Sequence, residues 1–339
     1  MSDFRATRRA LGSLAGAAAL AATIRPARAA TKLRIGLLHT LSPAPLYLAM
    51  ERGYFAAEGL EAEFRFFEAA QPIAAAAVAG DIDIGITALT GGFFALAGRG
   101  ALKVIAGGLH EQKGYEGSAV LASPKAYEAG LTGIDKLGGR SFAITQFGSS
   151  FHYMLGRLAE TAHFDLKSVT LRPVQEIGNM VAAVRSNQVD ATIAIASMAK
   201  PLEAAGAAKI IGWVGDLVPY QITAVFAASR IISGRAQDVG AFARAYQRGV
   251  AEFRAAFLLP NPVETDRAIA DIKKYVFTGD PDGARKIRGG VGWYDEGAGL
   301  DVADVTTQIR WFTEQGLVKV AVDPAEVIDT RFIPPLRQS

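Results

Sequence analysis

Short apolar runs alternate with amphipathic stretches along the first third of the chain. Four of these runs are strand-like, with apolar or alternating side chains: 34–37, 61–67, 81–86 and 103–108. Three stretches between them have the apolar spacing of helices: 46–58, 73–79 and 92–97. Strands that alternate with helices of this length predict βαβ units and a parallel sheet.

The same order of strands and helices recurs 107 residues further along the chain. The second set of strand-like runs is 141–144, 168–174, 188–193 and 210–215. The helical stretches of this second set are 151–163, 180–186 and 198–205. Because four runs align in register without a gap, the pattern indicates an internal repeat. We therefore predict an α/β fold of two lobes, each a parallel-dominated sheet flanked by helices.

Two further β-rich runs, Ser118–Ser123 and Thr223–Ser229, lie where the chain would leave the first lobe and return to it. After Gln237 the pattern becomes helical, over 239–258, 263–275, 281–288 and 302–315. These helices are expected to pack on the first lobe. The predicted division is 30–123 together with 224–339 for lobe 1, and 124–223 for lobe 2.

The first 29 residues have the three-part pattern of an export signal. Arg8 and Arg9 precede a weakly apolar run that is too short to span a bilayer as a helix, and small residues follow at Ala27 and Ala29. The paired arginines predict a twin-arginine signal peptide over residues 1–29, cleaved after Ala29. The alternative is a surface amphipathic helix. An exported protein with no later span of ~18 apolar residues is expected to be free in the periplasm.

Composition excludes several classes of protein. The formal net charge is +3, but five arginines and one aspartate give residues 1–29 a charge of +4, so the rest of the chain is near neutral and predicts no nucleic-acid partner. There is no cysteine, which excludes disulfides, a cysteine nucleophile and a lipid-modified cysteine. The four histidines have no metal-binding spacing. We therefore expect neither a metal nor a cofactor.

Candidate ligand-binding residues follow from the strand order. Ligands of parallel α/β sheets bind at the carboxyl ends of the strands, so the repeat nominates loops that face one another across a cleft. The candidates in or beside these loops are His39, Ser42, Pro43, Thr87, Ala88, Thr90, His110, Gln146, Gly148, Ser149, Ser150, Glu176, Ser197 and Asp216.

Gly148, Ser149 and Ser150 form the most specific of these candidates. Glycine lets a ligand approach the backbone, and the serines precede a helix whose first N–H groups are free to bind an anion or a carbonyl group. The alternative is plain helix capping without a ligand, which applies equally to Ser197.

Catalytic motifs are missing from the sequence. It contains neither a G-x-S-x-G nucleophile elbow nor a G-x-x-x-x-G-K-[ST] phosphate loop. Asp81 and Asp83, at the start of a strand-like run, are interpreted as turn and capping residues rather than as paired acids. We therefore expect a protein that is not an enzyme.

Several motifs of this chain resemble a known family. They are Pro45–Phe55 with Glu58–Leu60, then Ala79–Gly85, Ile134–Arg140, Gly148–Ser150 and Asn187–Ala191. In these motifs, and over 31–339, the chain is similar to periplasmic solute-binding proteins of ABC importers, in the group of nitrate, sulfonate, taurine and thiamine-pyrimidine binders.

The resemblance implies a two-lobed periplasmic binding protein fold of the type II kind, with Ser118–Ser123 and Thr223–Ser229 as the crossing strands. It further implies that a monomer closes on its ligand and docks on an inner-membrane permease. The candidate loops contain no arginine, which favours a small organic solute, such as a sulfonate, a carboxylate or a pyrimidine-like molecule, over a bare inorganic anion. The alternatives are a sensor that presents its ligand to a receptor, and a thiamine-pyrimidine biosynthetic enzyme; the lack of cysteine argues against the enzyme.

Overall fold

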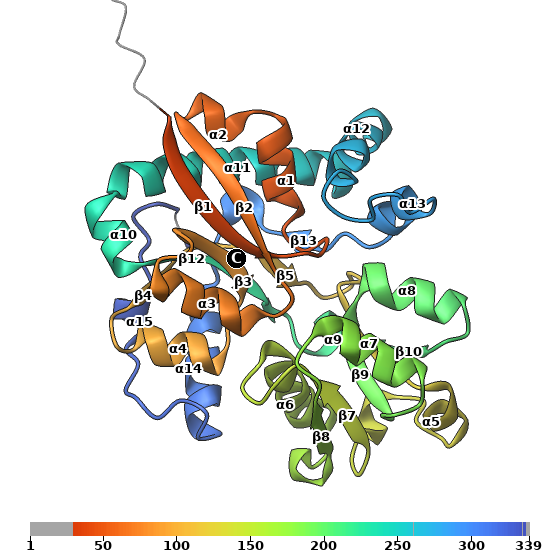
Figure 1. Ribbon diagram of the computed structural model, residues 1–339. Coiled ribbons are helices and arrows are strands. Elements are labelled where there is room, and N and C mark those ends of the chain that lie inside the picture. Colours follow the sequence, from red (N-terminus) through yellow and green to blue (C-terminus); the bar gives the residue numbers. More distant parts are fainter. Residues whose placement is uncertain (1–29, 260, 334, 337–339) are drawn as a thin grey trace, which may run out of the picture.

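Two five-stranded sheets, each flanked by helices, form two lobes joined by a small third sheet (Figure 1). This computed structural model describes residues 30–259, 261–333 and 335–336. The predicted signal peptide, residues 1–29, lies outside the described residues.

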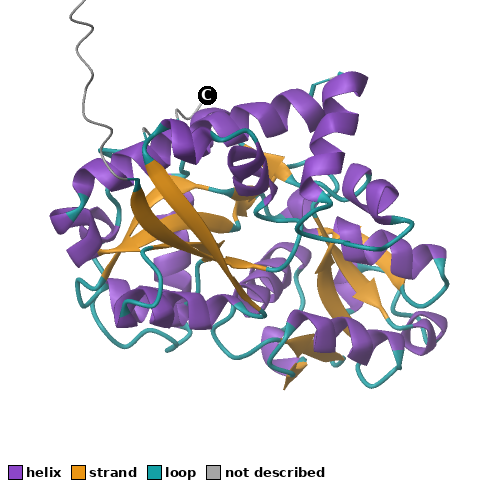
Figure 2. Ribbon diagram, turned by 45° about the horizontal axis from the view of Figure 1, so that its top comes forward, coloured by secondary structure: helices purple, strands orange, loops and turns teal. Residues whose placement is uncertain are grey.

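The sheet of the first lobe has the order β2-β1-β3-β12-β4. Its strands are β1 (Thr31–Leu38), β2 (Leu60–Phe67), β3 (Ile84–Ala88), β4 (Leu102–Gly107) and β12 (Thr223–Ala228). β1 pairs in parallel with β2 and β3, whereas β12 is antiparallel to β3 and β4. Every residue of β3 and β12 is buried, because helices cover both faces of the sheet (Figure 2).

The sheet of the second lobe repeats this arrangement, with the order β10-β6-β9-β7-β8. Its strands are β6 (Ser118–Ala122), β7 (Ser141–Ile144), β8 (Thr170–Pro173), β9 (Ala191–Ile195) and β10 (Lys209–Trp213). Read from β8, the order matches that of the first sheet strand for strand, with β6 in the place of β12. The structure thus bears out the internal repeat.

One contact is the same in both lobes. The carboxylate of Asp83 accepts a hydrogen bond from the backbone N–H of Arg34 at 2.8 Å, and the carboxylate of Asp190 accepts one from the N–H of Ser141 at 2.8 Å. Asp83 precedes β3 and ties it to β1, and Asp190 precedes β9 and ties it to β7. Asp83 is therefore a structural residue, but it links two strands instead of capping or turning its own segment as predicted.

Neither sheet is wholly parallel, because the runs predicted as crossing strands, Ser118–Ser123 and Thr223–Ser229, lie within the sheets as β6 and β12. The segments that cross between the lobes are the strands next to them. The chain leaves lobe 1 through β5 (Leu109–Glu111) and returns through β11 (Tyr220–Gln221). β5 is the central strand of the three-stranded sheet and pairs with both β11 and β13 (Trp293–Tyr294). The parallel strands of each sheet end at the edge that faces this connecting sheet. A strand that enters the sheet at that edge therefore has the opposite direction. β6 and β12 are therefore antiparallel, and β6 already belongs to the second sheet, although its residues precede the predicted boundary at 123–124.

Each predicted helical stretch contains a helix, although 46–58 is divided into two, and the chain forms further short helices that the pattern did not predict. The helices are α1 (Ala44–Glu51), α2 (Tyr54–Ala57), α3 (Ala70–Ala79), α4 (Gly91–Ala97), α5 (Pro124–Glu128), α6 (Ser150–Ala162), α7 (Ile177–Arg185), α8 (Ala196–Ala204), α9 (Val214–Leu217), α10 (Ser229–Gly234), α11 (Ala236–Phe257), α12 (Pro262–Ile272), α13 (Gly283–Arg288), α14 (Val302–Glu314) and α15 (Pro324–Val327).

Two of the C-terminal helices differ in what they cover. α11 buries Val239, Phe242, Tyr246, Val250 and Phe253 at helical spacing and packs against α1 and α2 of the first lobe. α14 instead contacts both α4 of the first lobe and α6 of the second. No helix in the described part of the chain is long and apolar enough to cross a membrane.

Candidate functional site

A cavity lies between the two lobes, at the carboxyl ends of β1, β3, β7 and β9. Residues of both lobes line it. Six of the predicted candidates are among them: Ser42, Ala88, Thr90, Gln146, Ser149 and Ser150. The volume in which the centre of a water molecule can lie is about 50 Å³. Since one water needs ~10–15 Å³ on this measure, the cavity holds only a few waters. The two lobes therefore lie close together in this structure.

The lining of the cavity carries no ionisable side chain. Of the described residues, no Asp, Glu, Lys, Arg or His contributes to it. Its polar groups are the hydroxyls of serines and threonines and the carboxamides of Gln71 and Gln146, set among apolar side chains such as Leu38, Leu109 and Met154. Such a surface binds an organic molecule through hydrogen bonds and apolar contact.

Ser149 and Ser150, at the start of α6, line the cavity, whereas the predicted site residue Gly148 just before them does not. Gly148 has φ +77°, a conformation that favours glycine, and its carbonyl accepts a hydrogen bond of 2.9 Å from the N–H of Gly91 across the two lobes. The Ser149 hydroxyl accepts a hydrogen bond from the N–H of His152 at 3.3 Å, so Ser149 caps the helix. Ser150 is 5% exposed, lines the cavity and has no side-chain hydrogen bond within the described residues.

The corresponding segment of the first lobe, residues 87–92, leads into α4. Thr90 caps this helix by accepting a hydrogen bond from the N–H of Phe93 at 3.0 Å, and it lines the cavity together with Ala88. Thr87 does not line the cavity; its hydroxyl is buried and lacks a hydrogen-bond partner in the described chain.

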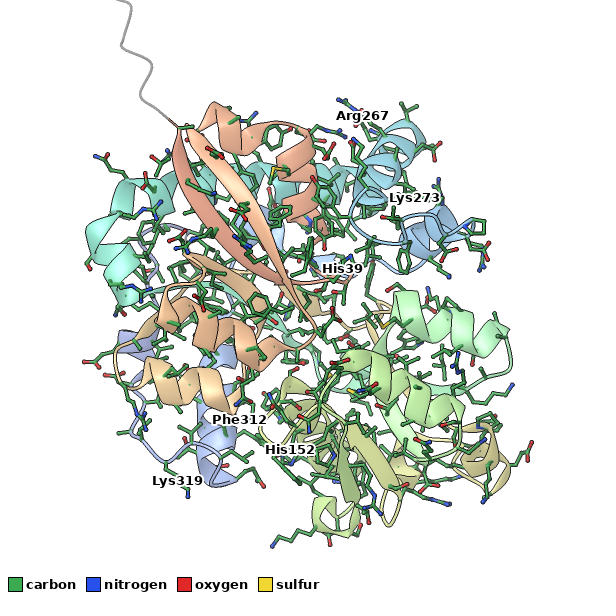
Figure 3. The ribbon with its side chains drawn as sticks, in the orientation of Figure 1. His39, His152, Arg267, Lys273, Phe312 and Lys319 are labelled. Atoms are coloured by element: carbon green, nitrogen blue, oxygen red, sulfur yellow. The ribbon has the colours of Figure 1, made fainter. Side chains whose placement is uncertain are left out.

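Neither of the two predicted histidines, His39 and His110, lines the cavity, and nor does His152; Figure 3 shows His39 in the first lobe and His152 in the second. Nε2 of His39 lies 2.8 Å from the carbonyl oxygen of Tyr275. Nδ1 of His152 accepts a hydrogen bond from the N–H of Gly148 at 3.2 Å, and burial lowers the pKa of this histidine. His110 lies with Nδ1 3.1 Å from a carboxylate oxygen of Asp295. Burial lowers the pKa of His110, but the neighbouring carboxylate outweighs this effect, so its pKa is raised.

The remaining four candidates also lie outside the lining of the cavity. Pro43 and Glu176 directly precede the first residues of α1 and α7. Ser197 is buried on α8, with a hydroxyl that has no partner in the described part of the chain. Asp216 accepts a hydrogen bond from the N–H of Gly114 at 3.1 Å.

Gln71 is a lining residue that the sequence analysis missed. It lies in the first turn of α3, just after β2. The candidate residues of the first lobe follow its first, third and fourth strand-like runs, whereas Gln71 follows the second run, 61–67. The same carboxyl-end argument, applied to residues 68–71, would have found it.

Two buried carboxyl groups lie behind the cavity, at the connecting sheet. Glu111 is fully buried and accepts hydrogen bonds from the N–H of Ser118 at 2.9 and 3.2 Å; burial raises its pKa to about 7. Asp304 accepts hydrogen bonds from the N–H of Gln221 at 3.0 Å and from the side chain of Gln308 at 2.7 Å, and burial raises its pKa to about 6. Neither side chain reaches the cavity. The described residues contain no cluster of three or more His, Cys, Asp or Glu side chains that could hold a metal ion.

Solved structures with this fold come from several organisms. The alkanesulfonate-binding protein SsuA from Xanthomonas axonopodis pv. citri, bound to MOPS, is 17% identical, with a TM-score of 0.70 over 88% of this chain and 98% of that one. The periplasmic nitrate-binding protein NrtA from Synechocystis PCC 6803 is 14% identical, with a TM-score of 0.69 over 88% of this chain and 86% of that one. The likeness confirms the predicted two-lobed α/β fold.

A Candida albicans protein, the product of gene CA3427, is described as having the generic periplasmic binding protein fold. It is 15% identical, with a TM-score of 0.66 over 91% of this chain and 98% of that one. None of the curated proteins matches the sequence. The family described as NMT1/THI5 like matches residues 41–256, which is more than half of the chain. This chain therefore belongs to the NMT1/THI5-like family.

Proposed function

We propose that this protein is the solute-binding component of an ABC import system. It captures a small organic solute, a sulfonate, a carboxylate or a pyrimidine-like molecule, between its lobes and delivers it to a permease in the inner membrane. The observation that carries the proposal is a cavity lined from both lobes by the loops at the carboxyl ends of their strands. SsuA, an alkanesulfonate-binding protein, and NrtA, a nitrate-binding protein, share the fold and support it.

The side chains around the cavity favour binding without catalysis. A serine nucleophile needs a base within hydrogen-bond reach of its hydroxyl. The Ser149 hydroxyl instead accepts from a backbone N–H, and neither histidine nor carboxylate lines the cavity in the described chain. Ligand capture followed by release is therefore the activity proposed.

Closure around the ligand would occur at the connecting sheet. The chain crosses between the lobes only through β5 and β11 in the described range, and both strands are short. Short crossing segments of this kind absorb the rotation of two rigid lobes. Binding should therefore make the molecule more compact.

The proposed location is the periplasm, with the protein acting as a monomer. The pattern of Arg8 and Arg9 followed by a weakly apolar run supports export of the folded chain and removal of residues 1–29.

A binding screen on residues 30–339 tests the function. Thermal unfolding is measured with sulfonates, carboxylates, pyrimidines and uncharged amides, and each hit is titrated by calorimetry. A ligand at a hundredfold excess over its Kd adds about 2.7 kcal/mol to the free energy of unfolding. The hit should be recovered chemically unchanged and should lower the radius of gyration in small-angle scattering. Conversion of the ligand, or no hit in any class, would overturn the proposal.

A further inference from the structure

We propose that the cavity selects an uncharged ligand with both hydrogen-bond donors and acceptors, bound by Gln71 and Gln146 from opposite lobes. This inference rests on the proposed function and narrows its ligand class. Of the ligand classes named in the proposed function, it excludes sulfonates and carboxylates and keeps uncharged, pyrimidine-like molecules.

The first argument is the neutrality of the lining. A charged ligand that enters an enclosed, largely apolar cavity loses its hydration, and this loss is offset only when a counter-charge and further hydrogen bonds replace the water. Among the described residues of the lining there is no cation for an anionic ligand and no carboxylate for a cationic one.

The second argument concerns the helices that begin at the cavity, whose N–H groups could in principle hold an anion. Several of these donors already have protein acceptors. The N–H of Phe93 donates to Thr90, that of His152 donates to Ser149, and that of Ala196 donates to the carbonyl of Gly117. An anion would therefore meet a partly satisfied set of backbone donors and no positive side chain.

The third argument concerns the uncharged hydrogen-bonding groups that line the cavity. The carboxamides of Gln71 in α3 and Gln146 in the loop before α6 line it from the two lobes, and neither has a side-chain hydrogen bond within the described residues. The Gln71 carboxamide lies against Gly92, where a Cβ atom would come within 3.0 Å of it. A carboxamide presents a donor and an acceptor side by side, and the free Ser150 hydroxyl can do either. Amides, ureas and uncharged nitrogen heterocycles present the complementary pair.

The apolar walls complete the ligand class. Leu38 of the first lobe, Leu109 of the connecting sheet and Met154 of the second lobe line the cavity together with these polar groups. They favour a ligand with an apolar or aromatic body beside its polar edge.

Matched pairs of probes that differ in charge test the proposal. Benzamide and benzoate, methanesulfonamide and methanesulfonate, and uracil and orotate are titrated against residues 30–339 by calorimetry, after a thermal-shift screen of uncharged and anionic compounds. The uncharged member of each binding pair should bind at least tenfold more tightly. Anions that bind as tightly as their uncharged partners, or more tightly, would overturn this inference and leave the proposed function standing. No binding by any compound would overturn both.

Substitutions of the two glutamines provide the second readout. Gln71→Ala and Gln146→Ala should each weaken the binding of the best uncharged compound by roughly two- to tenfold, since each removes one hydrogen bond. Gln315→Ala, at the exposed end of α14, is the matched control and should bind normally. Thermal unfolding of the empty variants separates lost binding from lost folding. Unchanged affinity in both cavity variants would remove these side chains from the site.

Discussion

Replacement of Gly156 by alanine tests the packing between the lobes. Gly156 lies in the middle of α6, and the ring of Trp311 in α14 lies directly over it. A Cβ atom at Gly156 would be 2.1 Å from Cζ2 and 2.7 Å from Cε2 of that ring. Trp311 is 3% exposed and packs edge-on against His152 and Tyr153 of α6, so the ring has little room to move.

Two effects of opposite sign decide the outcome of Gly156→Ala. Alanine is favoured over glycine inside a helix by about 1 kcal/mol. Inserting an atom into a well-packed interior costs about 1–3 kcal/mol. Because the nearest contact is far below van der Waals distance and involves a rigid ring, the cost should lie at the upper end. We expect a net loss of about 1–2 kcal/mol in the free energy of unfolding.

Gly178→Ala is the matched control. Gly178 is in the first turn of α7 and has no atom within 4 Å of a Cβ added there, so alanine should be neutral or stabilising by up to about 1 kcal/mol. Urea unfolding followed by circular dichroism measures both variants, and tryptophan fluorescence reports on the surroundings of Trp311. If Gly156→Ala proved as stable as the wild type, or gained as much as the control, the close packing of α6 and α14 described here would be refuted.

Three further predictions concern protonation, capping and export. Burial raises the pKa of Glu111 from 4.5 to about 7, so the folded state keeps a proton that the unfolded state releases, and wild-type stability should fall from pH 4.5 to 7. Relative to Glu111→Gln the fall should be on the order of 3 kcal/mol, and parallel stability curves for the two proteins would contradict it. Ser149→Ala should lower the free energy of unfolding of the empty protein by ~0.5–2 kcal/mol through the lost cap, and unchanged urea unfolding would argue against this role. Arg8→Lys with Arg9→Lys should retain the precursor in the cytoplasm, and an unchanged yield in periplasmic extracts would exclude the twin-arginine route.

The periodic pattern of the sequence was sufficient to predict the two lobes. Burial on both faces of a sheet demands continuous apolar strands, and helices on both faces demand amphipathic stretches between them, so the βαβ rhythm and its repeat are visible without coordinates. A structural role for Asp83 was also predicted, but its partner, the N–H of Arg34 on a neighbouring strand, was not. The start of α6 at Ser150 followed from the glycine and serines before it.

Contacts between segments far apart in the chain were decided only by the tertiary structure. His39 and His110 lie in or beside the predicted loops, yet each contacts a partner that the loop sequence does not reveal: the carbonyl of Tyr275 for His39 and the carboxylate of Asp295 for His110. The antiparallel direction of β6 and β12 depends on how the chain crosses between lobes, which local pattern does not encode. Which polar groups face the cavity, Gln71 among them, and the fit of Trp311 over Gly156 both arise from the packing of one lobe against the other. Periodicity records which side of an element is buried, but not which distant element buries it.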